Sequence, residues 1–265
     1  MVRRMSRDRP SEPPPGQAHF GFRDVAEDDK ARLVGDIFSN VASRYDLMND
    51  LMSAGVHRLW KRDMVAALGT RPVARLLDLA GGTGDIALRV AARGAPPKGA
   101  PSVGAVTVCD INPDMLEVGR ERAWNRGILA FDWLCGDAEA LPLASASFDA
   151  VTIAFGIRNV THVERALAEI ARVLKPGGRF LCLEFTPDVT PALRGAYDWF
   201  SFRVIPAIGR AVTGESDAYR YLVESIRRFP DPERFAAMIT EAGFAGVRGR
   251  RLSGGVAALH SAWRV

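Results

Sequence analysis

The fold is decided by residues 76–85, which read Leu76-Leu77-Asp78-Leu79-Ala80-Gly81-Gly82-Thr83-Gly84-Asp85. In this stretch an apolar run enters a glycine-rich turn, and a helical pattern follows. Glycine lets the backbone approach a ligand closely, and the start of a helix offers free N–H groups. The stretch therefore predicts a ligand site at the end of a buried strand. By itself it leaves the ligand open, because Gly82-x-Gly84-x-x-Ala87 also satisfies the dinucleotide fingerprint of nicotinamide oxidoreductases.

Short apolar runs alternate with helical patterns around this turn. Such alternation predicts an α/β fold, a Rossmann-like doubly wound sheet with helices on both faces. A final helix at 231–242 precedes two strands separated by Ser253-Gly254-Gly255, which predicts a terminal antiparallel hairpin. The predicted strands cover residues 73–79, 105–109, 132–135, 150–155, 179–185, 246–252 and 256–263, and the predicted intervening helices cover residues 84–93, 113–126 and 163–174.

The part of the chain before residue 71 has a different pattern. Residues 1–29 begin with four arginines and then several prolines, so we expect a flexible N-terminal arm; a phosphate- or membrane-seeking tail is the alternative. The helical spacing of apolar residues in 30–70 predicts a lid of helices, the second of which covers residues 56–68. We expect residues 30–265 to form one domain, whose Rossmann-like core covers 71–265.

Composition excludes several classes of protein. The 265 residues carry 35 Lys and Arg against 31 Asp and Glu, a net charge of +4 that is too small to indicate nucleic-acid binding. Three cysteines without a CxxC pair argue against a disulfide framework and fit a reducing compartment. The four histidines have no ligand-like spacing with these cysteines, which argues against a structural zinc site. No apolar run has the length of a membrane span. We therefore expect a cytoplasmic protein.

Two acidic residues after successive strands narrow the choice of cofactor. Asp110 ends the second predicted strand, where a carboxylate suits a ribose diol, and Asp137-Ala138 follows the third, where an acid suits the amine of adenine. Two further segments, Ser147-Phe148-Asp149-Ala150-Val151 and Leu174-Lys175-Pro176-Gly177-Gly178-Arg179, follow in order. This ordered set resembles the class I S-adenosylmethionine-dependent methyltransferases rather than the dehydrogenases.

The acceptor side points to one family. Phe155-Gly156-Ile157-Arg158-Asn159-Val160 lies at the end of the fourth predicted strand, where ligands collect in such sheets. Two segments resemble the two signatures of the UbiE/MenG C-methyltransferases of ubiquinone and menaquinone biosynthesis. The first is Tyr45-Asp46-x-Met48-Asn49-Asp50-x-Met52-Ser53-x-x-x-His57-x-x-Trp60, and the second is Arg172 to Arg179 continued by Leu183-Glu184-Phe185. The resemblance extends from about residue 22 to the C-terminus.

This resemblance implies methylation of a ring carbon on a polyprenylated quinol, either 2-polyprenyl-6-methoxy-1,4-benzoquinol or demethylmenaquinol, with S-adenosylmethionine as methyl donor and no metal. Another small phenolic or lipid acceptor is the alternative. A nicotinamide oxidoreductase and a membrane- or RNA-binding module that uses the basic arm are more distant ones. The resemblance leaves open a peripheral contact with the inner face of the membrane, a homodimer and a biosynthetic complex.

Site residues carry over by position. The resemblance implies that Thr83, Asp110, Asp137 and Ala138 bind the cofactor, that Gly82 and Gly84 shape its loop, and that Ala154 stands where the family has a serine near the cofactor. For the quinol, we expect Arg158 and Asn159 to bind or polarise an oxygen, while Tyr45, Asp46 and His57 close the site from the N-terminal helices. Two structural alternatives accompany these roles: a structural ion pair for Arg158, and a helix-packing role for His57.

The aromatic stretch from Tyr197 to Ile208 is apolar on more than one helical face. We expect core packing there; a wall for an isoprenoid tail or a surface against the bilayer is the alternative.

Overall fold

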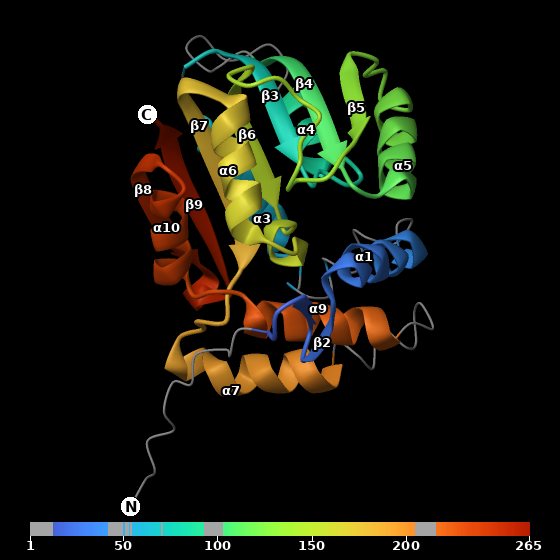
Figure 1. Cartoon of the computed structure of the whole chain (residues 1–265), viewed down its shortest axis with the longest axis vertical. Coiled ribbons are helices and arrows are strands. Elements are labelled where there is room, and N and C mark those ends of the chain that lie inside the picture. The colour runs from blue at the N-terminus through green and yellow to red at the C-terminus, as the bar shows by residue number, and fades with distance from the viewer. Residues whose placement is uncertain are drawn as a thin grey trace, which may run out of the picture.

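The centre of the computed structural model is a seven-stranded sheet of order β5-β4-β3-β6-β7-β9-β8 (Figure 1). The structure describes residues 13–41, 50, 53, 55–69, 71–92, 103–204 and 216–265. The strands are β3 (Val73–Leu79), β4 (Val103–Asp110), β5 (Phe131–Cys135), β6 (Phe148–Ala154), β7 (Leu174–Phe185), β8 (Phe244–Leu252) and β9 (Ala257–Arg264). Strands β5, β4, β3, β6 and β7 run parallel, and β9 pairs antiparallel with both β7 and β8. The predicted doubly wound sheet with a terminal antiparallel hairpin is confirmed.

Helices cover both faces of this sheet. They are α3 (His57–Ala66), α4 (Asp85–Ala91), α5 (Pro113–Trp124), α6 (Val163–Val173) and α10 (Pro232–Glu241). Successive side chains of a strand point to opposite faces, and each face therefore has its own core. In β3, Leu76 packs in one apolar cluster, while Leu77 and Leu79 pack in the other. A parallel strand buried on both faces is apolar almost throughout, which is why the central strands could be recognised in the sequence.

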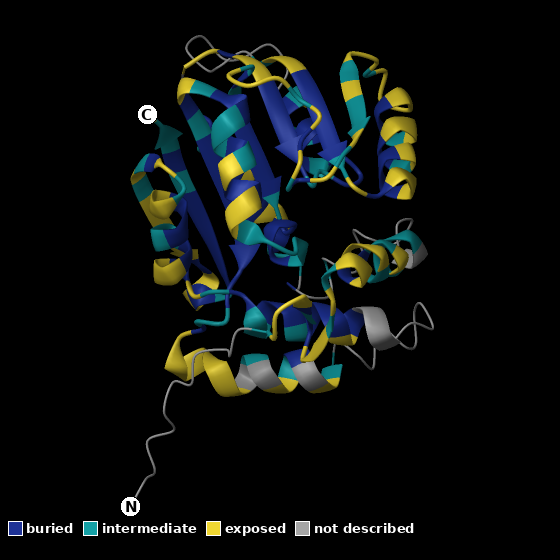
Figure 2. Ribbon diagram, viewed as in Figure 1, coloured by how far each residue is buried: buried dark blue, intermediate teal, exposed yellow. Residues whose placement is uncertain are grey.

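A second layer lies beyond the carboxyl ends of the parallel strands. Figure 1 shows α1 (Glu27–Val41), α7 (Pro191–Trp199) and α9 (Ser216–Arg228) there, with the antiparallel hairpin of β1 (Gln17–Phe20) and β2 (Arg23–Ala26) beside α9. The central strands β3, β6, β7 and β9 are mostly buried, whereas α1 and α7 expose their outer faces (Figure 2). The sheet therefore provides the frame, and the second layer closes one end of it.

The prediction of a flexible arm over residues 1–29 is wrong for residues 17–26, which form the β1–β2 hairpin, and α1 already begins at Glu27. Ala18 and Phe20 are buried, and the ring of Phe20 stacks on Tyr221 of α9 with centroids 4.5 Å apart. Composition missed this hairpin because only two of its side chains enter the core, and their partner lies two hundred residues away in the chain. Residues 1–12 lie outside the described part of the chain.

The aromatic stretch after β7 divides between core and surface. It forms α7 and the π-helical turn η3 (Phe200–Val204). Phe200 packs against the apolar core, whereas Trp199 is 65% exposed. The expected core packing therefore holds for Phe200 and is wrong for Trp199; residues 205–215 are not described. None of the helices in the described ranges has both the length and the apolar character needed to span a membrane.

Candidate active site

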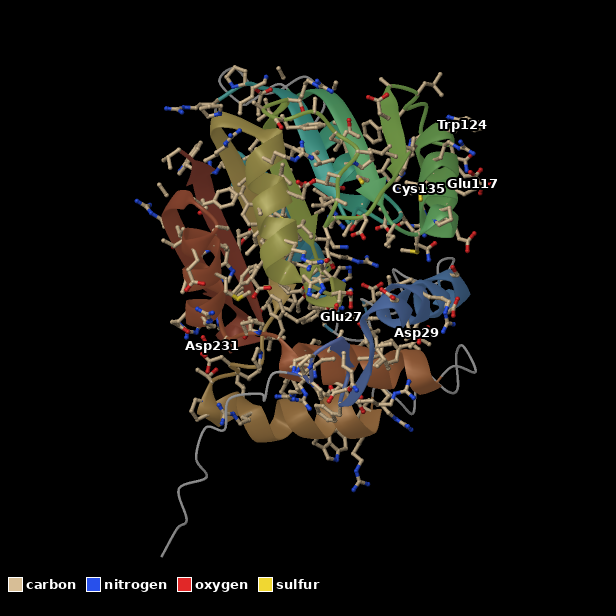
Figure 3. The ribbon with its side chains drawn as sticks, viewed as in Figure 1. Glu27, Asp29, Glu117, Trp124, Cys135 and Asp231 are labelled. Carbon is tan, nitrogen blue, oxygen red and sulfur yellow. The ribbon has the colours of Figure 1, made fainter. Side chains whose placement is uncertain are left out.

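A cavity of about 420 Å³ lies at the carboxyl ends of the parallel strands, under α1. The loops that follow β3, β4, β5 and β6 line it, together with one face of α1 and the side chain of Lys61 from α3. Figure 3 shows Glu27 at the start of α1, next to the segment that leads into α6, and Glu27 Oε2 lies 3.3 Å from Nε2 of His162. The cavity is of the size that proteins use for small molecules and cofactors.

The glycine turn after β3 forms the floor of the cavity. Ala80 and Gly82 both have positive φ, of 47° and 50°, and Gly81 passes so close to β4 that a Cβ there would lie 2.7 Å from Cγ1 of Val108. Gly84 has a φ of 71° at the start of α4, and a Cβ on it would lie 2.8 Å from the ring of Trp133. Gly82 lines the cavity and Gly84 does not. Gly84 therefore shapes the turn from behind.

The predicted cofactor residues lie together along one wall, where Thr83, Asp110, Asp137, Ala138 and Ala154 all line the cavity. Asp110 accepts hydrogen bonds from the N–H of Gly82 at 2.8 Å and of Asn112 at 2.9 Å. Burial raises the pKa of this carboxyl group, and the N–H donors oppose that effect. The hydroxyl of Thr83 accepts a hydrogen bond from Arg122 at 3.0 Å.

Acidic side chains outnumber cationic ones on the wall. Among the described lining residues, Lys61, His162 and Arg165 are the cationic or protonatable ones, and the acids outnumber them: Glu27, Asp28, Asp78, Asp85, Asp110, Asp137 and Glu139. A cavity whose charged side chains are mainly acidic favours a ligand with positively charged groups.

The acceptor side is formed by the turn after β6. Phe155 has a φ of 60°, and the short 3-10 helix η2 (Ile157–Asn159) follows it. Asn159 lines the cavity, and its Oδ1 accepts a hydrogen bond from the Tyr221 hydroxyl at 3.2 Å. This bond orients the amide oxygen of Asn159 toward Tyr221, and its NH₂ group supplies two separate donors. Tyr221 is buried, and burial raises the pKa of its hydroxyl, which keeps it protonated as a donor.

Arg158 does not line the cavity. Its Nη1 donates to Glu184 Oε1 at 2.6 Å and to the carbonyl of Phe155 at 2.8 Å, and the two charged side chains are 2% and 1% exposed. The prediction that Arg158 contacts the quinol is therefore not supported by its position. The structural ion pair, the alternative reading of this residue, is what the structure contains.

His57 also lies outside the cavity wall. Its side chain is buried, with Nδ1 2.9 Å from the hydroxyl of Ser53 and 3.6 Å from Asp50 Oδ1. Burial, aided by the neighbouring Lys61, lowers the pKa of His57 to about 4, so the ring is neutral near pH 7. His57 therefore packs at the start of α3 rather than closing the site. Tyr45 and Asp46 lie outside the described residues.

Sequence reasoning missed several polar residues around the cavity. Lys61 of α3 donates to Asp85 Oδ2 at 2.8 Å, and Lys30 of α1 donates to the carbonyl of Val160 at 2.9 Å. Burial lowers the pKa of Lys30 to about 8, against the raising effect of Glu139. The available signal was a lysine on the apolar side of a predicted helix. Because an unpaired lysine is rarely buried, a lysine at such a position indicates a specific partner.

Comparison with known proteins agrees with this geometry. Residues 24–264 match the model of the ubiE/COQ5 methyltransferase family. A protein of Bradyrhizobium diazoefficiens named "Ubiquinone/menaquinone biosynthesis C-methyltransferase UbiE" is 57% identical, over 97% of this chain and 100% of its own. One of the same name from Dinoroseobacter shibae is 56% identical, over 93% of this chain and 96% of its own.

Solved structures share the fold. A SAM-dependent methyltransferase of Thermotoga maritima has a TM-score of 0.58 at 19% identity, covering 88% of this chain and 100% of its own. Another from Aquifex aeolicus has a TM-score of 0.54 at 16% identity, covering 77% of this chain and 89% of its own. The fold is that of the class I S-adenosylmethionine-dependent methyltransferases. By its sequence match over nearly the whole length and by its fold, this chain belongs to the ubiE/COQ5 methyltransferase family.

Proposed function

We propose that this enzyme transfers a methyl group from S-adenosylmethionine to a ring carbon of a polyprenylated quinol in ubiquinone or menaquinone biosynthesis. The observation that carries the proposal is the juxtaposition, in one cavity, of the cofactor wall and Asn159. The names of the relatives, at 56–58% identity over nearly their whole length, support the choice of quinol as acceptor.

The residues present fit the cofactor. Gly81 and Gly82 bring the backbone of the turn to the cavity, and Asp110 and Asp137 provide carboxylates for a ribose and an adenine. The predominantly acidic wall matches the positive sulfonium and ammonium groups of S-adenosylmethionine. When bound, this cofactor supplies an activated methyl group on its sulfonium sulfur.

On the acceptor side, we assign Asn159 the binding of a ring oxygen. A ring carbon is a weak nucleophile until a neighbouring hydroxyl gives its proton to a base or to water, and the oxygen then carries negative charge. The Asn159 NH₂ group, oriented by the bond between its amide oxygen and Tyr221, stabilises that charge by a hydrogen bond. A hydrogen-bond donor fixed before the reaction needs no reorganisation during it.

Arg158 has a positioning role in this proposal. Its ion pair with Glu184 and its hydrogen bond to the carbonyl of Phe155 tie η2 to the end of β7. The neighbouring Asn159 is held in place by the same segment. Arg158 therefore acts through Asn159 and does not contact the quinol.

A polyprenyl substrate resides in the bilayer, and we propose a peripheral contact of this protein with the membrane. The exposed side chains of Leu193 and Trp199 on α7, with the exposed Arg194 and Arg203 nearby in the chain, support this contact, since such helices combine apolar and cationic groups. Flotation with vesicles containing anionic lipid tests it. Trp199→Ser is expected to weaken flotation, and unchanged flotation would speak against α7 as the contact.

The function is tested by transfer of label from S-adenosylmethionine. Purified protein is incubated with a short-chain 2-polyprenyl-6-methoxy-1,4-benzoquinol or with demethylmenaquinol, each with and without a reductant. Label on the ring carbon only under reducing conditions is expected, and the two acceptors are then ranked by rate. Cofactor binding without label on either quinol would refute the quinol assignment and favour another small phenolic or lipid acceptor.

A further inference from the structure

Three charged side chains meet at the end of the cavity formed by α3 and α4. Lys61 Nζ lies 2.8 Å from Asp85 Oδ2, and Arg89 Nε lies 3.0 Å from Asp85 Oδ1. Two cations thus share one carboxylate. Burial by itself would raise the pKa of Asp85, but Lys61 and Arg89 hold it below its ordinary value, so the carboxylate is ionised. The triad therefore keeps one positive charge without a counter-charge.

That charge is available on the cavity side. The Lys61 side chain is 3% exposed and lines the cavity, with Nζ 5.6 Å from the centre of the Phe155 ring. Arg89, by contrast, is 31% exposed and does not line the cavity. The ammonium group of Lys61 has three N–H donors, and the contact with Asp85 uses one of them.

A second acid on the wall, Asp78, interacts electrostatically with Lys61 but does not form an ion pair with it in the described contacts. Asp78 lies behind the glycine turn, where Thr152 donates to its Oδ1 at 2.9 Å and the N–H of Ala87 donates to its Oδ2 at 3.1 Å. Burial raises the pKa of Asp78 to about 7, so this carboxyl group is only partly ionised at neutral pH.

The order of the strands gives the direction of the bound cofactor. Along the carboxyl edge of the sheet, Asp137 follows β5, Asp110 ends β4, Gly81 follows β3, and Ala154 ends β6. These are three steps of about 4.8 Å each. With the adenine at Asp137 and the ribose at Asp110, the amino-acid end of the cofactor extends past the glycine turn toward β6. Lys61 lies at that end, since it faces Phe155, the residue after β6.

We propose that Lys61 binds the α-carboxylate of S-adenosylmethionine, with Asp85 and Arg89 as the residues that position it. This inference rests on the proposed function only for the identity of the cofactor and not for the quinol. A buried ammonium group recognises a carboxylate strongly because charge-assisted hydrogen bonds are shorter and stronger than neutral ones. Lys61 would thus select cofactors that carry a free amino-acid carboxylate.

The test compares two ligands by isothermal titration calorimetry, without any acceptor. One is S-adenosylmethionine, and the other is decarboxylated S-adenosylmethionine, which keeps the adenosine, the sulfonium and the amine. Lys61→Met is expected to weaken S-adenosylmethionine binding roughly 10- to 100-fold, the range for loss of one hydrogen bond to a charged group. The affinity for the decarboxylated ligand is expected to change less than threefold.

The matched control is Lys175→Met. Lys175 Nζ pairs with Asp149 Oδ1 at 2.7 Å, a similar Lys–Asp contact, at the opposite end of the sheet. Lys175→Met is expected to leave the affinities for S-adenosylmethionine and for its decarboxylated form unchanged. Lys61→Gln, which retains an N–H donor toward Asp85, provides a second test if the methionine variant is poorly folded. Equal weakening for both ligands, or unchanged affinity for S-adenosylmethionine, would overturn the proposal. Because no quinol is present, its failure is distinguishable from failure of the acceptor assignment.

Discussion

The buried ion pair of Arg158 and Glu184 offers a quantitative test of how the acceptor side is built. Replacing Glu184 by glutamine keeps the shape of the side chain and removes its charge. Glu184 Oε1 accepts hydrogen bonds from Arg158 Nη1 at 2.6 Å and from the N–H of Phe185 at 2.8 Å. In Glu184→Gln the guanidinium group would remain buried, 5.7 Å from the centre of the Phe185 ring, without a counter-charge.

The magnitude follows from that burial. With side-chain exposures of 2% and 1%, neither charge is screened by water. Breaking such a pair by removing one partner costs ~3–5 kcal/mol, because the charge that remains is uncompensated. The free energy of unfolding of a domain is only ~5–15 kcal/mol, so Glu184→Gln is expected to lose roughly a fifth or more of the stability. A double variant, Arg158→Met with Glu184→Leu, buries no charge and is expected to recover most of that loss.

Urea unfolding followed by circular dichroism measures these differences. The single variant should have a markedly lower midpoint at the same slope, and the double variant a midpoint near that of the wild type. A Glu184→Gln protein within about 1 kcal/mol of the wild type would refute the reasoning. So would a double variant that is no more stable than the single one. Methyl transfer by the double variant then separates the folding role of Arg158 from its role in positioning Asn159.

Three further predictions follow from single contacts. Tyr221→Phe removes the hydrogen bond to the Asn159 amide. In steady-state kinetics it is expected to lower kcat by roughly threefold to tenfold, with little change in the KM for the cofactor. A changed cofactor KM with an unchanged kcat would contradict this prediction. The pKa of Asp78 is about 7 in the folded protein, above its ordinary value of 3.8. Between these two values the folded protein keeps a proton on Asp78 that the unfolded chain has lost, so the stability falls as the pH rises from about 4 to about 7. Asp78→Asn should abolish that contribution in urea titrations across this range, and an identical pH dependence in both proteins would show the assignment to be wrong. Gly81→Ala is expected to lower the free energy of unfolding by ~1–3 kcal/mol, because a methyl group there would lie 2.7 Å from a side-chain carbon of β4. Gly177 has a φ of 75° and nothing within 4 Å of an added Cβ, so Gly177→Ala should lower it by only ~1–2 kcal/mol, from backbone strain. Unfolding curves in which the second variant is the less stable would contradict the close packing at Gly81.

Most of the sheet could be predicted because its signals are local. β3 was predicted with the observed bounds, 73–79, and the runs that became β4 and β5 were recognised to within two residues at each end. A parallel strand buried on both faces is a continuous apolar run whatever its neighbours are. The glycine turn is equally local, because its positive φ angles and close approach to β4 require glycine at particular positions.

The cofactor side of the cavity could also be predicted, since position along a strand determines it. The carboxyl ends of parallel strands all lie at the same edge of the sheet, so Asp110 and Asp137, which follow two such strands, both line the cavity there. The hairpin at residues 17–26 was missed for the opposite reason. Its burial depends on Phe20 contacting Tyr221, and no local pattern encodes a contact of that range.

The sequence by itself determined the doubly wound sheet and the glycine turn, because each depends on residue types at fixed spacing. The class of cofactor came from the resemblance that its ordered motifs carry. Only the tertiary structure decided which polar side chains face the ligand. Arg158 and Asn159 are adjacent in the chain, yet one is buried against Glu184 and the other lines the cavity. Lys61 lies on a helix that sequence reasoning placed only as part of a lid. The physical reason is that a charged side chain settles where distant partners compensate its burial, and those partners come together only in the folded chain.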